Sequence, residues 1–248
     1  MKKKILLLFT IVAAMGSALA QDVDPSKMVD TPIFPHKLHW SFGVLGGYDQ
    51  NYHIVDMSYM SGMKYDAYTP GRTFGLQVGY SPAKWLTFRL DAVMIQKNYN
   101  MVHVFQYYNM RYSMTNLATN EYVNVPLVAM LNVGKKVRLH AFGGGYVGYW
   151  LSGHRSGQSY SMSYSITGDE STNVFDQDYE FSEVRDNRRD AGFTWGAGLS
   201  GIIAKHFELG AEVRWYYGIL DIQNDYMRNL SPRYNTTFVI QGGVCYWL

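Results

Sequence analysis

The sequence predicts an all-β protein, an eight-stranded antiparallel up-and-down transmembrane β-barrel. Three observations lead to this fold class. Apolar residues recur at every second position in eight runs, and the connections between the runs alternate between short and long. The charged residues of the clearest runs avoid the apolar phase. A content of 21 Tyr and 24 Gly in 248 residues also favours strands over long helices.

The first twenty residues have the features of an export signal. Lys2–Lys4 precede a short apolar core, and Ala18-Leu19-Ala20 is an A-x-A cleavage site. Gln21, not Cys, would follow the cut, which argues against a lipoprotein. We expect residues 1–20 to be a signal peptide cleaved after Ala20, residues 21–36 an N-terminal periplasmic segment, and residues 37–248 the barrel domain.

Charge and cysteine content exclude several classes of function. Removing Lys2–Lys4 from the 22 basic residues leaves 19 against 20 acids, so the mature chain of about 228 residues is nearly neutral. A neutral chain has no basic field to attract nucleic acid, so we expect no nucleic-acid partner. The single cysteine, Cys245, rules out an internal disulfide, and we expect it to face inward as a filler.

The eight runs are each long enough to be a strand. Within residues 86–97, Leu86, Phe88 and Leu90 alternate with polar or charged residues, and residues 207–219 repeat the pattern. The expected strands are 38–48, 74–80, 86–97, 121–132, 137–152, 193–203, 207–219 and 234–248. Pro126 and Gly143–Gly145 interrupt two of them, and we expect a bulge or a strand start at the first and a bulge at the second.

The connections alternate strictly in length. Short turns are expected at 81–84, 133–136 and 204–206, and long loops at 49–72, 98–119, 153–190 and 223–233. Outer-membrane barrels have short periplasmic turns and long extracellular loops. Both termini are therefore expected on the short-turn, periplasmic side.

The position of the charges separates a membrane barrel from a soluble one. Arg89, Asp91, Glu208, Glu212 and Arg214 all fall in the phase opposite to the apolar residues. A lipid-facing barrel requires this arrangement, whereas a soluble barrel would have an apolar interior. We expect the five residues to form a lumen charge network, which acts either as a salt-bridged plug or as an ion or proton path. Aromatic residues at strand ends are expected to form interfacial girdles: Trp40, Tyr80, Trp85, Tyr217 and Tyr246.

Residues 121–153 carry a family resemblance. They read EYVNVPLVAMLNVGKKVRLHAFGGGYVGYWLSG, with a Tyr-x-x-x-Pro-Leu strand, a GKK turn and a Gly-rich strand in succession. Together with Asp190–Phe193, Gly196–Gly198 and Tyr217-Gly218, they resemble the Bacteroidetes outer-membrane β-barrel family, labelled porin family or PorT-like. The resemblance implies residence in the outer membrane of a Gram-negative bacterium, contact with its lipid, and insertion by the barrel assembly machinery.

The last eight residues, QGGVCYWL, are similar to the terminal assembly signal of outer-membrane barrels. The signal positions are Gln241, Gly243, Tyr246 and Leu248, in the order polar, glycine, aromatic and hydrophobic. Such signals usually end in an aromatic residue, so the presence of Leu248 should make insertion depend more strongly on Tyr246.

Candidates for catalysis and metal binding are weak. His103 and His154 are expected near the extracellular rim, but no spacing ties them to a triad. His36 and His39 would point to opposite faces of a strand. Asp176-x-Asp178-x-Glu180 lacks the glycine and closing glutamate of a calcium loop. We expect no catalytic residues, no metal site and no cofactor.

The loops are rich in Tyr, Ser and Met, which supply adaptable contact area. The sequence therefore predicts a non-enzymatic barrel that presents long extracellular loops to a ligand or protein partner. The alternatives are a narrow porin-like channel, a component or accessory of a secretion or uptake complex, and a lipid-A-modifying barrel enzyme.

Overall fold

The computed structural model describes residues 40–55, 62–65, 69–108, 110–134, 136–163, 168–204, 206–224 and 232–248. The expected signal peptide, the expected periplasmic segment, His36 and His39 lie outside these residues. Within these ranges, no helix is long and apolar enough to span a membrane.

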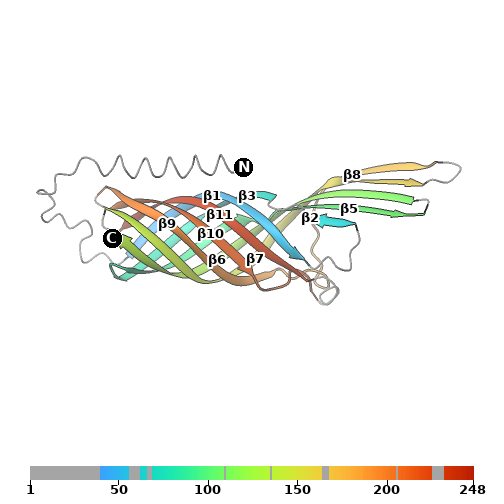
Figure 1. Cartoon of the computed structure of the whole chain (residues 1–248). Coiled ribbons are helices and arrows are strands. Elements are labelled where there is room, and N and C mark those ends of the chain that lie inside the picture. The colour runs from blue at the N-terminus through green and yellow to red at the C-terminus, as the bar shows by residue number, and fades with distance from the viewer. Residues whose placement is uncertain are drawn as a thin grey trace, which may run out of the picture. The chain divides into compact units, whose positions relative to one another are not determined.

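Eight strands pair in a closed antiparallel ring (Figure 1). Closure comes from the pairing of the first and last strands, which runs from Ser41 opposite Trp247 to Val55 opposite Arg233. The prediction of an eight-stranded up-and-down barrel is therefore confirmed. The ring strands in chain order are β1 (Trp40–Val55), β3 (Thr69–Ala83), β4 (Leu86–Gln96), β6 (Met110–Gly134), β7 (Val137–Ser163), β9 (Arg189–Ala204), β10 (Phe207–Gly218) and β11 (Arg233–Trp247).

Three of the expected long loops are mostly strand in the residues that the structure describes. β6 and β7 are 25 and 27 residues long, more than twice the about 9–11 residues that cross a bilayer. Three further strands lie in the segments expected as loops: β2 (Met63–Tyr65), β5 (Tyr99–Tyr107) and β8 (Glu170–Asp178). The prediction of loops at 49–72, 98–119 and 153–190 is wrong. β1 and β3 extend into the first segment, and β-forming residues of the other two pair with one another beyond the barrel.

The extra strands form one sheet that leaves the barrel. The lower part of β6, from 121 to 131, pairs with β4, and its upper part, from 110 to 118, pairs with β5. In the same way β7 pairs with β9 in its lower part and with β8 in its upper part. We call the four-stranded extension β5-β6-β7-β8 the protruding sheet. It lies at the opposite end of the barrel from the end of β11 (Figure 1).

The outer surface of the barrel is apolar. Outward side chains stay exposed on all eight ring strands, as a surface solvated by lipid requires. The expected girdle residues are also exposed, and the rings of Trp40 and Tyr80 lie 4.9 Å apart. Large exposed residues in this band include Phe42, Val44, Phe74, Leu76, Phe88, Leu90, Leu127, Leu139, Val147, Phe193, Leu209 and Ile240.

The two expected irregularities differ from the prediction. The β4–β6 ladder pairs Leu90 with Leu127 and resumes at Val93 with Asn124 in the same register, so Pro126 breaks the ladder without a bulge. The register of β7 is continuous through Gly143–Gly145 on both sides. A Cβ on Gly144 would lie 2.0 Å from the Leu127 oxygen, so glycine permits close strand approach there. The β6–β7 ladder instead shifts between residues 121 and 122.

Candidate functional site

Four of the five charged residues expected in the lumen meet in one ionic cluster. Arg89 donates to both oxygens of Glu212, at 2.8 and 2.9 Å. Arg214 lies 2.9 Å from Asp91 and 3.0 Å from Glu212 Oε1, which also accepts from Arg89, while Arg89 lies 3.2 Å from Asp91. Both guanidinium groups lie over the ring of Phe142, at 5.1 and 4.9 Å from its centroid. Each cation therefore contacts two carboxylates, and each carboxylate contacts two cations.

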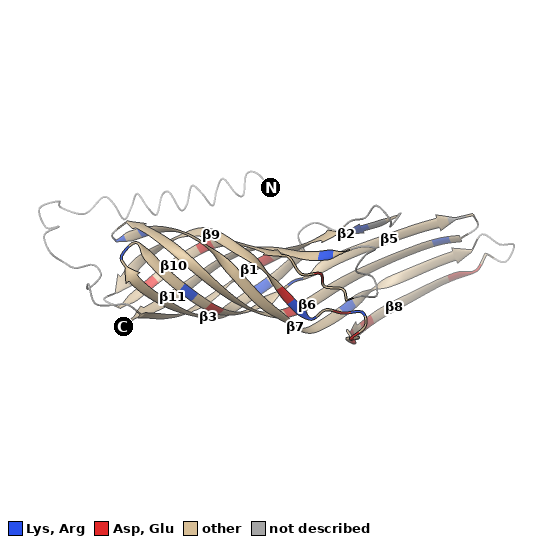
Figure 2. Cartoon of the chain, turned by 90° about the horizontal axis from the view of Figure 1, so that it is seen from below, with Lys and Arg blue, Asp and Glu red and all other residues tan. Residues whose placement is uncertain are grey.

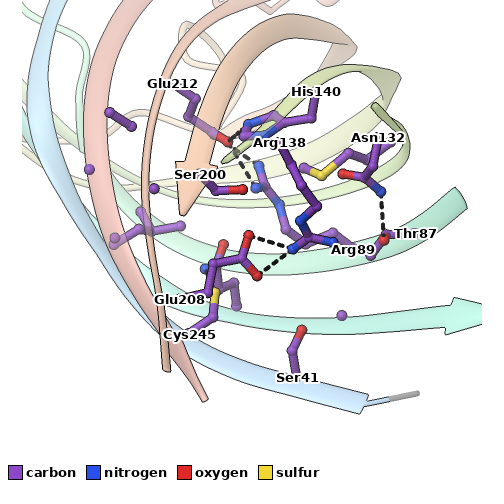
Figure 3. A pocket seen from close by; sticks show the side chains of 18 of the residues that line it. Ser41, Thr87, Arg89, Asn132, Arg138, His140, Ser200, Glu208, Glu212 and Cys245 are labelled. Carbon is purple, nitrogen blue, oxygen red and sulfur yellow. Dashed lines mark hydrogen bonds and ion pairs between the residues drawn. The ribbon is translucent and has the colours of Figure 1, made fainter. Parts of the chain in front are cut away.

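The fifth expected residue, Glu208, lies nearer the short-turn end. It accepts a hydrogen bond of 2.5 Å from Arg138 (Figure 3). It also accepts one of 2.6 Å from the Trp247 indole. A cavity of about 70 Å³ is lined by Arg138 and Glu208 and by Arg89 and Glu212 of the four-residue cluster. Cys245 lines the cavity and lies 2.5 Å from the Gln77 amide nitrogen, so it faces inward as expected.

Most of the buried cations in the described residues are held in ion pairs. Five cations are buried, Arg89, Lys97, Arg138, Arg155 and Arg214, beside seven buried carboxylates, Asp49, Asp91, Asp186, Asp190, Glu208, Glu212 and Asp221. Buried charges are tolerated when they are paired. Ion pairs join Arg89, Arg214, Arg138 and Lys97 to Asp91, Glu212, Glu208 and Asp190, as a filled interior requires.

A second ion pair closes the extracellular end of the interior. Lys97 and Asp190 form a buried salt bridge, and the Lys97 ammonium also lies 4.8 Å from the ring of Tyr122 and 5.0 Å from that of Tyr146. Asp190 accepts a further hydrogen bond of 3.2 Å from the Tyr146 hydroxyl. The ammonium is thus surrounded by aromatic faces and one carboxylate, which leaves little room for water.

Aromatic side chains fill the mouth above this pair. Tyr122, Trp150 and Tyr179 stack with ring centroids 5.7 and 5.3 Å apart, and Phe181 packs edge-on against both Trp150 and Tyr179. Arg155 lies over Tyr179 at 4.4 Å. Because Tyr179 and Phe181 come from the segment that follows β8, that segment folds back over the opening of the barrel.

Sequence reasoning missed several interior residues. Lys97 continues the inward phase of Arg89 and Asp91, so extending that phase by six positions would have found it. Arg138 and His140 occupy the inward phase of β7, but Gly-rich alternation in this strand hides the two faces. His140 Nε2 lies 3.7 Å from Glu212.

Three of the four expected assembly-signal residues lie on β11, and Leu248 follows the last residue of this strand. Gln241 points inward and donates to Glu212 at 2.6 Å, whereas Tyr246 points outward opposite Phe42. Gly243 is opposite Leu45, and the Leu248 amide donates to the Trp40 oxygen at 3.0 Å. The contacts of Gly243, Tyr246 and Leu248 lie at the seam between β1 and β11, and the contact of Gln241 lies between β11 and β10. An assembly role for these residues stays a prediction.

The two histidines expected near the rim lie apart on the protruding sheet. His154 lies between two carboxylates, with Nδ1 at 3.0 Å from Asp178 and Nε2 at 2.6 Å from Asp176. His103 packs edge-on against Tyr112 at 6.0 Å. Asp176 and Asp178 thus serve as ion-pair partners of a histidine. Among the residues that the structure describes, no group of three His, Cys, Asp or Glu side chains could hold a metal ion.

The pairing of His154 predicts a pH-dependent hairpin. Hydrogen bonds to Asp178 and Asp176 raise the pKa of His154 above its ordinary value of about 6.5. Because the pKa of His154 is higher in the folded than in the unfolded chain, its interactions stabilise the folded hairpin fully at a pH below the unfolded-state pKa. This stabilisation is lost as the pH rises through the folded-state pKa. As the pH rises from the unfolded-state pKa through the folded-state pKa of His154, we expect amide hydrogen exchange in β8 to accelerate more than the intrinsic base-catalysed rate does. The variant His154→Asn should lack the extra acceleration; identical profiles for both proteins would contradict this.

The amino-acid sequence matches the family model described as "Outer membrane protein beta-barrel domain" over residues 20–224. The chain belongs to this family. It is therefore a small outer-membrane β-barrel protein of a Gram-negative bacterium, surrounded by membrane lipid. No curated protein matches its sequence.

Several solved structures of small outer-membrane proteins are similar to this chain. Ail of Yersinia pestis is 12% identical, with 84% of this chain and 100% of that chain covered and a TM-score of 0.35. Neisserial surface protein A is 11% identical, with 83% and 96% covered and a TM-score of 0.40. OprG of Pseudomonas aeruginosa is 11% identical, with 85% and 97% covered and a TM-score of 0.45. The strand pairing and the family match, not these distant likenesses, support the fold.

Proposed function

We propose that this outer-membrane barrel is a non-enzymatic binding protein whose protruding sheet captures an extracellular macromolecule. One observation carries the proposal: β5 to β8 continue as a paired sheet beyond the length that a membrane requires. A sheet held by backbone hydrogen bonds presents a more rigid surface than loops of the same length, which reduces the entropy lost on binding.

The composition of the sheet supports a contact surface. Apolar and aromatic side chains remain exposed on it, including Val104, Phe105 and Met110. Beyond the membrane no lipid covers these side chains, so a bound partner would remove their apolar surface from water. Tyr, Ser and Met are frequent on its strands, and they provide contact area and hydrogen-bonding groups at low entropic cost.

The contents of the barrel disfavour the channel alternative. Ionic clusters occupy the lower interior, and the stack of Tyr122, Trp150 and Tyr179 covers the upper opening. An eight-stranded barrel has an interior just wide enough for side chains to fill. We infer that the lumen charge network is a structural plug. A role in a secretion or uptake complex, and a place in the PorT-like group of Bacteroidetes, are compatible with the proposal as narrower versions of it.

Trimming the sheet tests the proposed function. The trimmed variant lacks 102–115 and 158–174, with an Asn-Gly turn joining Met101 to Asn116 and Gly157 to Phe175, two residue pairs that already lie opposite each other. Intact and trimmed proteins in nanodiscs are applied to an array of peptides, extracellular proteins and glycans. We expect the intact protein to bind at least one class and the trimmed protein to lose that binding by about tenfold or more, since the contact area is removed.

Planar-bilayer recording of the intact protein provides the second arm of this test. We expect no discrete conductance steps, because the interior is filled. Reproducible steps would favour the narrow channel. The proposed binding role would be contradicted if the intact protein bound no member of the array, or if the intact and trimmed proteins bound equally.

A further inference from the structure

The outer edge of β8 carries unused backbone hydrogen-bonding groups. In the β7–β8 ladder, the Tyr179 amide donates to the Gly153 oxygen, and the Ser163 amide donates to the Asp169 oxygen. The residues of odd number therefore direct their backbone groups toward β7. The groups of even number point to the open side: Glu170, Thr172, Val174, Asp176 and Asp178. In the part of the chain that the structure describes, no strand pairs with this side.

Side chains along this edge divide into a neutral centre and acidic ends. Glu170 lies at one end and Asp176 and Asp178 at the other, and all three are exposed. Between them Ser171–Phe175 carry no charge, and Val174 is 72% exposed. Figure 2 shows red segments at both ends of β8 and a tan stretch between them. An extended partner would therefore meet β-forming residues at its centre and exposed carboxylates at both ends, of which Asp176 and Asp178 also contact His154 of β7.

The charge pattern disfavours a second copy of the same edge. Antiparallel pairing centred on Val174 would place Glu170 opposite Asp178 twice, and parallel in-register pairing would align every acid with itself. Like charges directly opposite one another destabilise a strand pair. Charged residues on an edge also protect a sheet from self-association.

We propose that the β8 edge binds an extended basic polypeptide segment by adding it as a further strand of the protruding sheet. This inference rests on the proposed function and names the site and the class of partner. Backbone hydrogen bonds from the five edge residues supply the affinity, and Lys or Arg opposite Glu170, Asp176 and Asp178 select the partner. Because these charges are exposed, the selectivity weakens as salt is added.

The register fixes the probe that tests the inference. In antiparallel pairing, the peptide Lys-Thr-Lys-Thr-Val-Thr-Thr-Thr-Lys places its Lys residues opposite Asp178, Asp176 and Glu170 and its Val opposite Val174. Binding to the full chain in nanodiscs is measured by fluorescence anisotropy. We expect a peptide with Glu at the three Lys positions to bind at least about tenfold more weakly. N-methylation of the third, fifth and seventh residues, which removes three donors, should have an effect of similar size.

A proline pair on β8 separates edge pairing from general attraction. Thr172→Pro/Val174→Pro removes two amide donors that point away from β7, so the β7–β8 ladder keeps its own hydrogen bonds. Its matched control, Thr172→Val/Val174→Thr, keeps both donors and the same overall composition. We expect the proline pair to weaken peptide binding by about tenfold and the control to leave it within about twofold.

The outcomes distinguish this inference from the proposed function. Three results would overturn edge addition. The proline pair and its control could bind the peptide equally, the intact chain could bind the Lys and Glu peptides equally, or the Lys peptide could fail to bind the intact chain. If the proline pair binds normally while the trimmed variant does not, the protruding sheet binds through a face and only the edge is excluded. If the trimmed variant also binds the peptide normally, both proposals fail.

Discussion

Arg214→Met should lower the free energy of unfolding by about 3–5 kcal/mol, the usual cost of leaving a buried charge without its partner. Arg214 is fully buried and contacts Asp91, Glu212 and the Tyr216 hydroxyl. Methionine fills much of the volume but leaves the four-residue cluster with one carboxylate in excess. Arg89 then has to balance both carboxylates, although it lies 3.2 Å from Asp91 and already holds Glu212 with two hydrogen bonds.

The double variant Arg214→Met/Asp91→Leu should recover most of that loss. It removes one cation and one carboxylate together, and the bidentate pair of Arg89 with Glu212 remains. Replacement of a buried ion pair by apolar residues of similar volume is often neutral or stabilising. The same expectation distinguishes a plug from a proton path, because a plug requires balanced charge and packing, whereas a path requires the titratable groups themselves.

Reversible urea unfolding in lipid vesicles, followed by tryptophan fluorescence and by the heat-dependent shift in gel migration, measures both effects. Glu170→Gln, an exposed change on β8, should alter stability by less than about 0.5 kcal/mol and serves as the reference. If the double variant is as unstable as the sum of the two single variants, the charges do not act as a pair. A stability of Arg214→Met equal to that of the unchanged protein would contradict the plug itself.

The period-two pattern explains why the barrel could be predicted from sequence. A one-residue change of register would move every apolar side chain of a strand from lipid to lumen. The alternation within each short run of sequence therefore shows which of its side chains face the lipid. The ion-pair partners could not be predicted from local sequence. Lys97 and Asp190 are 93 positions apart, and Arg89 and Glu212 are 123 apart, so only the closed ring brings them together.

The protruding sheet was missed for a related reason. Residues 110–118 show little contrast between their two faces, because both faces are partly exposed once the strand leaves the membrane. A strand without an apolar face has no strong period-two signal, and its Tyr, Ser and Met content is equally typical of recognition loops. The pairing of β6 with β5 and of β7 with β8 then depends on short local hairpins, whose register comes from the turns.

Deletion of residues 246–248 should reduce the amount of folded barrel in the outer membrane by about tenfold or more, since the last strand loses contacts with both of its neighbours, β1 and β10, together. The Trp247 indole donates to Glu208 at 2.6 Å, its amide donates to His206 at 2.8 Å, and the Leu248 amide donates to Trp40. Tyr246 packs against the ring of Phe207, with centroids 5.2 Å apart. An open seam leaves unpaired backbone groups in lipid, each of which costs several kcal/mol.

Two single substitutions separate assembly from stability in this prediction. Tyr246 faces outward and Trp247 faces inward, so Tyr246→Ala removes the aromatic position of the proposed assembly signal, whereas Trp247→Phe keeps an aromatic ring and removes the hydrogen bond to Glu208. If the terminus is read during insertion, Tyr246→Ala should lower the level in the outer membrane strongly while the purified chain still refolds in detergent. Trp247→Phe should insert normally and unfold at lower urea, because Glu208 loses a buried partner. Normal outer-membrane levels of both the truncated chain and Tyr246→Ala would contradict the assembly role, and they would leave the last residues with seam closure alone.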